Sequence, residues 1–148
     1  MGARILVLNG PNLNMLGVRQ PQVYGKNSYA DVVDVCRRAA AARDAEVEVE
    51  VRQTNDEAEL VGWIHDVARD RNFSAIVINP AAWTHTSVAV ADALVIPEVP
   101  IIEVHISNVH AREAFRHHSY VSPIAAGVIA GFGIAGYGYA VDRAVDLS

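Results

Sequence analysis

The sequence predicts an α/β protein with a flavodoxin-like, doubly wound sheet of five parallel strands in the order 2-1-3-4-5. Short apolar runs alternate along the chain with segments of helical periodicity, which is typical of a parallel sheet covered by helices on both faces. No repeat, low-complexity tract or linker interrupts the 148 residues, so we expect a single domain spanning 1–148. Polar side chains follow several of the expected strands at their carboxyl ends, where sheets of this kind bind ligands.

Five segments have the length and composition of strands. Most of them are short and apolar, as expected of strands that are buried on both faces. In the second segment acidic residues alternate with valine, which predicts a strand with one solvated face at a sheet edge. The fifth segment is the weakest of the set. The expected strands are Arg4–Asn9, Glu46–Val51, Ala75–Asn79, Ile101–His105 and Gly127–Ala130.

Four helices are expected between and after these strands. Two of them begin at capping boxes, in which a hydroxyl side chain and an acidic residue three positions later bond to each other's backbone: Ser28 with Asp31, and Thr54 with Glu57. Residues 10–28 contain several Gly and Pro without periodicity and predict a long loop, of a length that is usually functional. The expected helices run from Ser28 to about Asp44, from Thr54 through Val67, from Ser87 to Ile96 and from Ala135 to Ala144.

Composition argues against several classes of protein. The net charge of −5 disfavours broad nucleic-acid binding, because no excess of cations is available to displace counterions from phosphates. The sole cysteine, Cys36, permits no internal disulfide and suits a reducing cytoplasm. The apolar run after Met1 is too short for a signal peptide, and no uninterrupted apolar segment reaches the ~18 residues of a membrane helix. We therefore expect a cytoplasmic protein with neither a membrane nor a nucleic-acid partner.

The expected loop at 10–28 carries candidates for proton chemistry. It has neither the Gly-Lys-Ser/Thr nor the G-x-G-x-x-G spacing of phosphate-binding loops. It contains instead Asn12, Arg19 and Tyr24, and a guanidinium beside a phenol favours the anionic form that a base requires. The alternative is a turn asparagine, a solvated arginine and a tyrosine packed beneath the loop. Spacing alone does not decide between these interpretations.

A second polar segment follows the third expected strand, from Asn79 to Ser87. His85 lies just before a helix that Thr84, Thr86 or Ser87 can cap. The positive end of a helix disfavours an imidazolium, so a neutral His85 is suited to hydrogen-bond a substrate hydroxyl. Taken alone, however, this residue is better explained as a surface histidine in a capping loop.

A third segment begins at the fourth expected strand. Glu103 and His105 are two residues apart, so on a strand they share a face and the carboxylate can orient the imidazole. A glutamate within an apolar strand is costly to bury unless it is paired. Arg112 and Arg116 are four residues apart, which on a helix places them together as a grip for a carboxylate. The Glu103–His105 pair, the acid within an apolar strand and the two spaced arginines lie close together in the sequence. Together they favour a functional site over a solvated helix.

The histidines also raise the possibility of a metal site. The sequence contains neither H-x-x-x-H nor H-E-x-x-H spacing, and arginines in the same stretch would repel a divalent cation. We therefore expect no metal and no cofactor. The histidines concerned are His105, His110, His117 and His118.

Taken together, these segments resemble the type II 3-dehydroquinate dehydratases, enzymes of the shikimate and quinate pathways that work without imine chemistry. The resemblance extends from Ile5 to about Tyr137. Any single segment would be weak evidence, whereas four in the correct order and separation are specific. The four segments are Asn9–Asn14, Gly17–Gly25, Asn79–Ser87 and Glu103–Ser119.

The resemblance implies a proton-transfer role for residues already singled out. Tyr24 would remove the proton next to the ketone of 3-dehydroquinate to give an enolate, with Arg19 and Arg112 stabilising the phenolate. Asn12 would help to hold a water against the enolate oxygen. His105, oriented by Glu103, would protonate the departing hydroxyl to give 3-dehydroshikimate.

The resemblance also implies how the substrate is held and how subunits assemble. In this family the first loop closes as a lid, and an acid from a neighbouring subunit completes each site in trimers, four of which form a dodecamer. Asp92 would be that acid. The residues expected to bind substrate are Asn79, His85, Asp92, Ile106, Ser107, Arg112 and Arg116.

Small departures from the family pattern leave this chemistry intact. Gln20 stands where the family commonly has Glu, and Ala81 and Trp83 replace a glycine and a tyrosine. Ala91 stands where Arg is frequent. The change at Gln20 would soften lid closure, and the one at Ala91 would weaken a contact between subunits.

Two other functions compete with this interpretation. A flavodoxin-like module that binds FMN or a nucleotide is permitted by the fold, since fold alone does not determine function. Its phosphate would need a Ser/Thr-rich loop, which residues 10–28 do not supply. A metal-dependent hydrolase built on the histidines is the second alternative, and a chelator distinguishes it. The sequence does not separate a biosynthetic from a catabolic role for the dehydratase.

Overall fold

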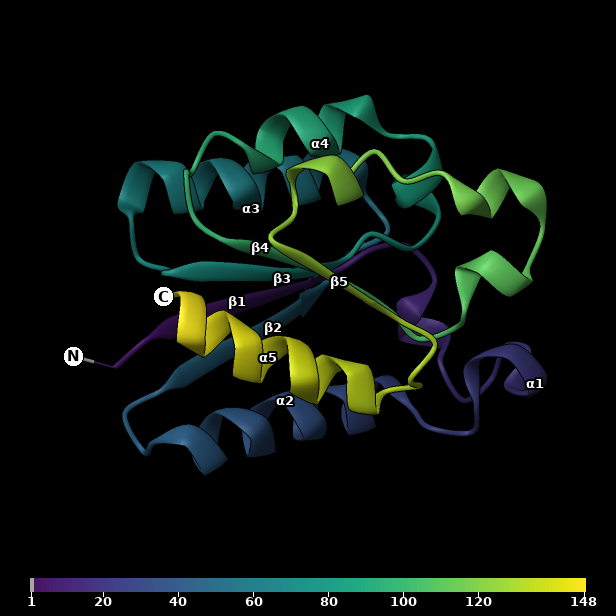
Figure 1. Cartoon of the computed structure of the whole chain (residues 1–148), viewed down its shortest axis with the longest axis horizontal. Coiled ribbons are helices and arrows are strands. Elements are labelled where there is room, and N and C mark those ends of the chain that lie inside the picture. Colours follow the sequence, from purple (N-terminus) through teal and green to yellow (C-terminus); the bar gives the residue numbers. More distant parts are fainter. Residues whose placement is uncertain (1) are drawn as a thin grey trace.

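The computed structural model describes residues 2–148 and confirms the predicted fold class. Five parallel strands form one sheet in the order β2-β1-β3-β4-β5. Figure 1 shows this sheet as a central layer between two pairs of helices. The strands are β1 (Arg4–Asn9), β2 (Glu48–Gln53), β3 (Ala75–Asn79), β4 (Ile101–His105) and β5 (Gly127–Ala130).

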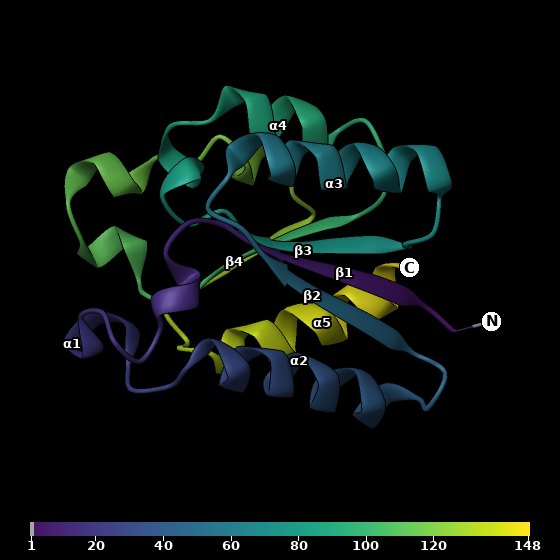
Figure 2. The same cartoon turned by 180° about the vertical axis from the view of Figure 1, so that it is seen from behind.

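Helices cover both faces of the sheet. The pair α2 (Tyr29–Arg43) and α5 (Ala135–Leu147) lies on one face, and the pair α3 (Glu57–Asp70) and α4 (Val88–Leu94) lies on the other (Figures 1 and 2). The short α1 (Pro21–Tyr24) projects at the end of the molecule opposite the chain termini. Within residues 2–148, no helix combines the length and apolar character needed to cross a membrane.

The core is built from alternating residues of the central strands. Ile5 and Val7 of β1 belong to the cluster under α2 and α5, whereas Leu6 and Leu8 belong to the cluster under α3 and α4. All four side chains are fully buried, which explains why β1 reads as a continuous apolar run rather than an alternating one. Burial on both faces therefore fixes β1 at the centre of the sheet.

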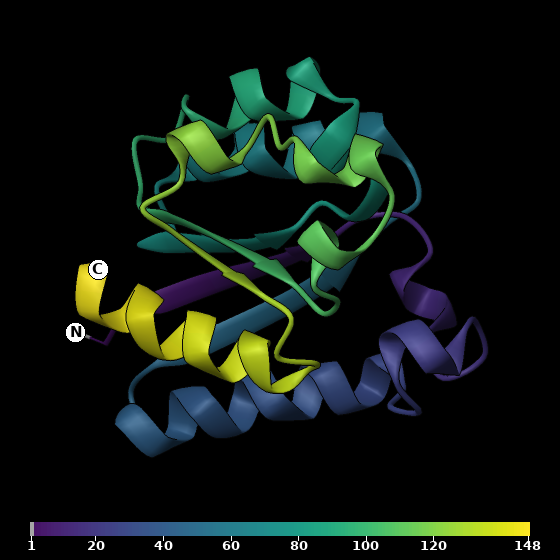
Figure 3. The same ribbon diagram turned by 45° about the vertical axis from the view of Figure 1, so that its right-hand side comes forward.

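Strand register brings polar residues to a common edge. Asn9, the last residue of β1, pairs with Gln53 of β2 and with Asn79 of β3, and His105 ends β4 opposite Ala130. Because all five strands are parallel, their carboxyl ends meet at one rim of the sheet. This rim carries the segments that follow β1, β3 and β4, which gather at one end of the molecule (Figure 3).

The structure corrects the predicted start of β2. The strand begins at Glu48 rather than Glu46 and ends two residues later than expected. The backbone N–H groups of Glu46 and Val47 donate to the Asp44 side chain and carbonyl, at 2.8 and 3.2 Å, and so form a turn instead. The alternation of acid and valine continues through this turn, which is why the pattern alone placed the strand too early.

Other element boundaries also differ from the predictions. The capping box at Ser28 is confirmed, with both reciprocal bonds present. The cap of α3 is Asp56 and not Thr54, because the Asp56 carboxylate accepts from the first helical N–H groups while the Thr54 hydroxyl accepts from the Asp56 N–H. The predicted long loop between 10 and 28 contains two short helical turns, Leu13–Met15 and Pro21–Tyr24. The helix α4 is shorter than predicted, and α5 is longer and extends to Leu147.

Candidate active site

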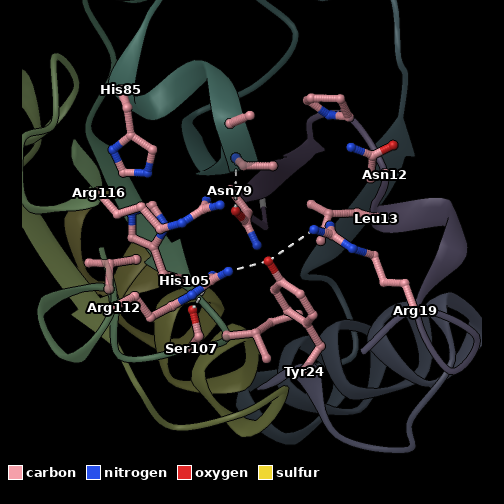
Figure 4. Close-up of a pocket in the computed structure, with 15 residues that line it drawn as sticks. Asn12, Leu13, Arg19, Tyr24, Asn79, His85, His105, Ser107, Arg112 and Arg116 are labelled. Carbon is pink, nitrogen blue, oxygen red and sulfur yellow. Dashed lines mark hydrogen bonds between the residues drawn. The ribbon is translucent and has the colours of Figure 1, made fainter. Parts of the chain in front are cut away.

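A pocket of about 190 Å³ lies beyond the carboxyl ends of β1, β3 and β4 (Figure 4). Ten of the twelve residues singled out in the sequence line it, although they come from four separate parts of the chain. Its charged lining consists of arginines, with no Asp or Glu among the described lining residues, so the pocket suits an anionic ligand. The ten residues are Asn12, Arg19, Tyr24, Asn79, His85, His105, Ile106, Ser107, Arg112 and Arg116.

The Tyr24 hydroxyl lies between two guanidinium groups at the centre of this pocket. Nη2 of Arg19 donates to the hydroxyl oxygen at 3.2 Å, and Nη1 of Arg112 donates at 3.0 Å (Figure 4). The Arg19 guanidinium also lies over the tyrosine ring, 4.3 Å from its centroid. Two guanidinium groups are thus placed at the same hydroxyl oxygen.

Backbone geometry places Tyr24 at the end of a single helical turn. Gln20 precedes the turn with a left-handed φ of 36°, and Pro21 occupies its first position, where its missing N–H costs nothing. Gly25 ends the turn with φ of 81°, a value that favours glycine. The turn directs the phenol inward, and its ring packs partly against the core cluster under α2.

The His105–Glu103 pair lies at the end of β4. Nε2–H of His105 donates to Oε2 of Glu103, and both side chains are buried, at 5% and 1% exposure. Burial raises the pKa of Glu103, but hydrogen bonds from His105, Ser122 and Ser119 outweigh it and hold the pKa below its usual range. The carboxylate is therefore ionised and fixes the orientation of the imidazole. Nδ1, the other ring nitrogen of His105, is not used in this bond, and His105 lines the pocket.

His85 is held as a neutral imidazole. Its Nδ1–H donates to the carbonyl of His118 at 2.7 Å, which leaves Nε2 as an acceptor. Burial lowers the pKa of His85, and the nearby charges of His105 and Arg116 lower it further. The sequence predicted a neutral His85 for a different reason, the positive end of the following helix. Burial is the larger cause, and Ser87 caps α4 through its bond from the Val90 N–H at 2.9 Å.

Asn79 reaches the pocket from β3 with both ends of its carboxamide anchored. Its Oδ1 accepts from the Ala81 N–H at 3.1 Å, and its Nδ2 donates to the Tyr137 hydroxyl at 2.8 Å. The same hydroxyl donates to Oδ1 of Asn9 at 2.7 Å, so Tyr137 of α5 joins the ends of β1 and β3. Sequence reasoning missed this residue, because a lone tyrosine in an apolar helix indicates only core packing.

The structure corrects the expected arrangement of Arg112 and Arg116. They do not share one helical face, because the chain forms two separate 3₁₀ turns at Val109–Ala111 and Ala114–His117 with Arg112 between them. Both arginines nevertheless line the pocket. Arg112 donates to the Ser107 hydroxyl at 3.1 Å as well as to Tyr24, and Arg116 pairs with Glu113 at 3.0 Å.

Two predicted site residues lie at the margins or outside. Asn12 has a left-handed φ of 71°, and its backbone N–H donates to Oδ1 of Asn55 at 2.9 Å, which sets its side chain at the pocket edge. Asp92 is exposed on α4 and does not line the pocket. Within this one chain, the structure therefore does not bring Asp92 to the other candidates.

The histidines do not converge on a metal-binding arrangement. In the part of the chain that the structure describes, no three His, Cys, Asp or Glu side chains are grouped closely enough to hold an ion. His105 and His85 are engaged with Glu103 and the His118 carbonyl, and His117 bonds to the Arg112 carbonyl. These bonds account for His85, His105 and His117 as hydrogen-bonding groups.

Comparison with known proteins identifies the family. The model of the class II dehydroquinases matches residues 3–145. The chain belongs to this family. It is 58% identical over 143 residues to 3-dehydroquinate dehydratase 2 of Pseudomonas aeruginosa, covering 97% of this chain and 94% of the relative.

Solved structures agree with this assignment. The type II dehydroquinase of Butyrivibrio crossotus superposes with a TM-score of 0.91 at 41% identity, covering 97% of both chains. That of Propionibacterium acnes gives a TM-score of 0.85 at 49% identity, covering 99% of this chain and 98% of the other. The resemblance inferred from four sequence segments is thus confirmed over nearly the whole chain.

Proposed function

We propose that this class II dehydroquinase dehydrates 3-dehydroquinate to 3-dehydroshikimate by anti elimination through an enolate, without a Schiff base. The observation that carries the proposal is the pairing of two proton-transfer groups in one pocket. Tyr24 is held between Arg19 and Arg112, and His105 is held by Glu103. The names of the homologous dehydratases support the same reaction.

The first step is removal of the proton next to the ketone. The Tyr24 phenolate takes this proton and becomes a phenol, and the electrons of the broken C–H bond move to the ketone oxygen to give an enolate. An unaided base removes such a proton poorly, so stabilising charge must already be in place. Arg19 and Arg112 stabilise the phenolate before transfer, and Asn12 at the pocket edge is placed to hold a water against the enolate oxygen.

The second step is loss of the hydroxyl as water. The electrons on the enolate oxygen re-form the ketone, and the enolate carbon–carbon pair moves to form the new double bond. The C–O bond breaks, and the protonated His105 donates its proton to the leaving oxygen. The buried Glu103 carboxylate stabilises the imidazolium that makes this transfer possible. Afterwards a proton must move from Tyr24 and one must return to His105 before the next turnover.

The remaining lining residues fit the substituents of a polyhydroxylated ring acid. Arg116 supplies a cation for orientation, the backbone at Ile106 and Ser107 offers hydrogen-bond donors, and Asn79 is rigidly anchored beside them. His85, with Nε2 as an acceptor, is suited to a ring hydroxyl that donates. The product is one that shikimate or quinate metabolism would use.

Asp92 is proposed to act across a subunit interface. It is exposed on α4 between Val88 and Ile96, each about half exposed at 52%. Large apolar side chains exposed four residues before and four residues after an acid would suit an interface. A trimer in which Asp92 enters the neighbouring site, with four trimers in a dodecamer, would cover this face and complete the pocket.

The reaction is tested directly by adding 3-dehydroquinate and following the ultraviolet absorbance of the conjugated enone. Borohydride added with substrate should leave mass and activity unchanged, because Lys26, the sole lysine, does not line the pocket. EDTA should also have no effect. Absence of the enone would contradict the proposal, and a mass adduct on Lys26 would contradict the imine-free route.

Subunit mixing tests the shared site. Asp92→Asn and Tyr24→Phe proteins, each inactive alone, should regain part of the activity when they are refolded together, because some sites then receive both intact residues. Mixed oligomers that form but remain inactive would contradict the shared site without affecting the reaction assignment.

A further inference from the structure

The Glu103 carboxylate is surrounded by donors that come from outside its own strand. The side chain is 1% exposed, yet both of its oxygens accept hydrogen bonds. Ser122 Oγ donates to Oε1 at 2.7 Å, and Ser119 Oγ lies 3.1 Å from each carboxylate oxygen. The segment 119–122 thus supplies the hydrogen bonds that water would provide to an exposed carboxylate.

The Ser119 hydroxyl has a fixed direction. Its oxygen accepts the backbone N–H of Val121 at 3.1 Å and that of Ser122 at 3.0 Å. A serine hydroxyl has two acceptor positions and one proton. With both acceptor positions occupied by amides, the single proton is directed to Glu103.

Ser122 has a narrower function than Ser119. Its hydroxyl bonds to Glu103 and to no other partner within residues 2–148. It therefore does not cap the local turn, which depends on the Ser119 hydroxyl. Removal of the Ser122 hydroxyl consequently changes the carboxylate and leaves the fold of the segment in place.

We propose that Ser119 and Ser122 are positioning residues for the general acid, because their hydroxyls keep Glu103 ionised and directed at His105 and so set the pH range over which His105 protonates the leaving group. The proposal rests on the proposed function of His105. A weaker, partly protonated Glu103 would both release the imidazole ring and stabilise its cation less. The acid would then be lost at a lower pH.

Several other charged and titratable groups face this pair. His85 approaches from the 3₁₀ turn at Ala81–His85, and its pKa is lowered in part by His105. Arg116, Arg112 and Arg19 line the same pocket together with Tyr24. Within residues 2–148 none of them hydrogen-bonds to the Glu103 carboxylate, so a substitution at Ser122 removes a bond that these groups do not make.

The direct test is an infrared titration of Glu103. Subtracting the spectrum of Glu103→Gln from that of the wild type at each pH isolates the carboxylate band of this residue. In Ser122→Ala the band should disappear about one pH unit higher than in the wild type, as expected for the loss of one hydrogen bond to a charged group. Ser122→Thr, which retains a hydroxyl, should restore the wild-type titration.

The kinetic test separates positioning from a structural role. In Ser122→Ala, kcat should fall roughly 10-fold with little change in KM, and the alkaline limb of the kcat profile should move to lower pH. In the Glu103→Gln background, Ser122→Ala should cause no further shift, because no carboxylate remains to be tuned. Ser119→Ala should act in the same direction, but its lost backbone bonds make Ser122→Ala the decisive variant.

The two proposals fail in different ways. An unchanged Glu103 titration in folded Ser122→Ala would overturn the positioning role, whether or not the enzyme turns over 3-dehydroquinate. A shifted titration in a protein that never forms the enone would instead contradict the proposed function. An equal fall in kcat for Ser122→Ala and Ser122→Thr would also overturn the inference, because the hydroxyl would then not be the relevant group.

Discussion

The two residues that we propose transfer protons lie in different structural settings. His105 ends a central strand, and its partner Glu103 is enclosed by serines from a neighbouring segment. Tyr24 is half-buried on a single helical turn and depends on two long arginine side chains, of which Arg19 belongs to the same segment. The proposed acid is therefore positioned as the sheet forms, whereas the proposed base is positioned only when residues 10–28 lie against the body of the protein. This difference predicts that substitutions near the base affect loop placement as well as chemistry.

Removal of the Tyr24 hydroxyl should have the largest effect. Tyr24→Phe retains the ring that packs against the core but removes the proposed base, the hydroxyl between Arg19 and Arg112. We expect kcat to fall by roughly 10²–10⁴-fold or more, with substrate binding largely intact. Enone formation measures kcat, and calorimetric titration with substrate measures binding. Turnover close to that of the wild type would contradict the mechanism.

Substitution of the acid should produce a different defect. His105→Ala removes the proposed proton donor for the leaving hydroxyl but leaves Tyr24 and its arginines unchanged. Exchange of the α-proton of the substrate with deuterium in the solvent should therefore survive better than dehydration, which should fall by roughly 10²–10⁴-fold. Mass spectrometry of recovered substrate measures this exchange. An equal loss of exchange and dehydration would show that His105 also serves the first step.

The two arginines next to Tyr24 provide a finer test of the comparison. Arg112 donates to both Tyr24 and Ser107, so it joins the 10–28 segment to the chain after β4. Among the described residues Arg19 donates only to Tyr24, which lies in the same 10–28 segment. Lysine keeps the charge, but its compact ammonium on a flexible stem lacks the planar guanidinium that holds both bonds of Arg112 in one geometry. We expect Arg112→Lys to lower kcat/KM roughly 10-fold more than Arg19→Lys, because about one additional hydrogen bond to a charged group is lost. Equal losses would indicate that charge alone matters.

Much of the fold could be predicted because it depends on local patterns. Apolar runs located the strands, and the parallel topology followed from their alternation with helices. The errors arose where one backbone or side-chain bond decides an element boundary, as at Asp44 and Asp56. The four-residue spacing of Arg112 and Arg116 suggested a helix that the chain does not form, although both side chains reach the pocket.

The supporting residues of the site could not be predicted from local patterns. Ser119 and Ser122 bond to a carboxylate 16 and 19 positions earlier, and Tyr137 bonds to an asparagine 58 positions earlier. The residues next to them in the sequence are those expected around any serine in a turn or any tyrosine in a helix, so they do not indicate these contacts. Polar residues after strands are visible in the sequence, whereas the groups that orient them become identifiable only through tertiary contacts.

The smallest catalytic effect is expected from Tyr137→Phe. This variant tests whether the pocket-lining end of β3 is as rigidly supported as the proposed acid, His105. The hydroxyl of Tyr137 accepts from Asn79 and donates to Asn9, and the side chain is fully buried. Its loss leaves two buried amide groups without this partner and should lower the free energy of unfolding by about 1–3 kcal/mol. KM should rise a few-fold through Asn79 with kcat nearly unchanged. Tyr139→Phe, on the same helix but 58% exposed, is the matched control and should leave both quantities unaltered.

The pH dependence of unfolding separates the contribution of the buried Tyr137 hydroxyl from any change in packing caused by Tyr137→Phe. Burial raises the pKa of Tyr137 in the folded protein well above the usual value for a tyrosine. A raised folded pKa means that the stabilising contribution of the protonated hydroxyl is complete below the unfolded pKa of ~10 and declines as the pH rises above it. Since phenylalanine does not titrate, the stability difference between the wild type and Tyr137→Phe should shrink by about 1.4 kcal/mol per pH unit above pH ~10. Urea unfolding at pH 8 and at pH 11 measures this difference, and a constant difference would show that the hydroxyl ionises as readily in the folded as in the unfolded chain.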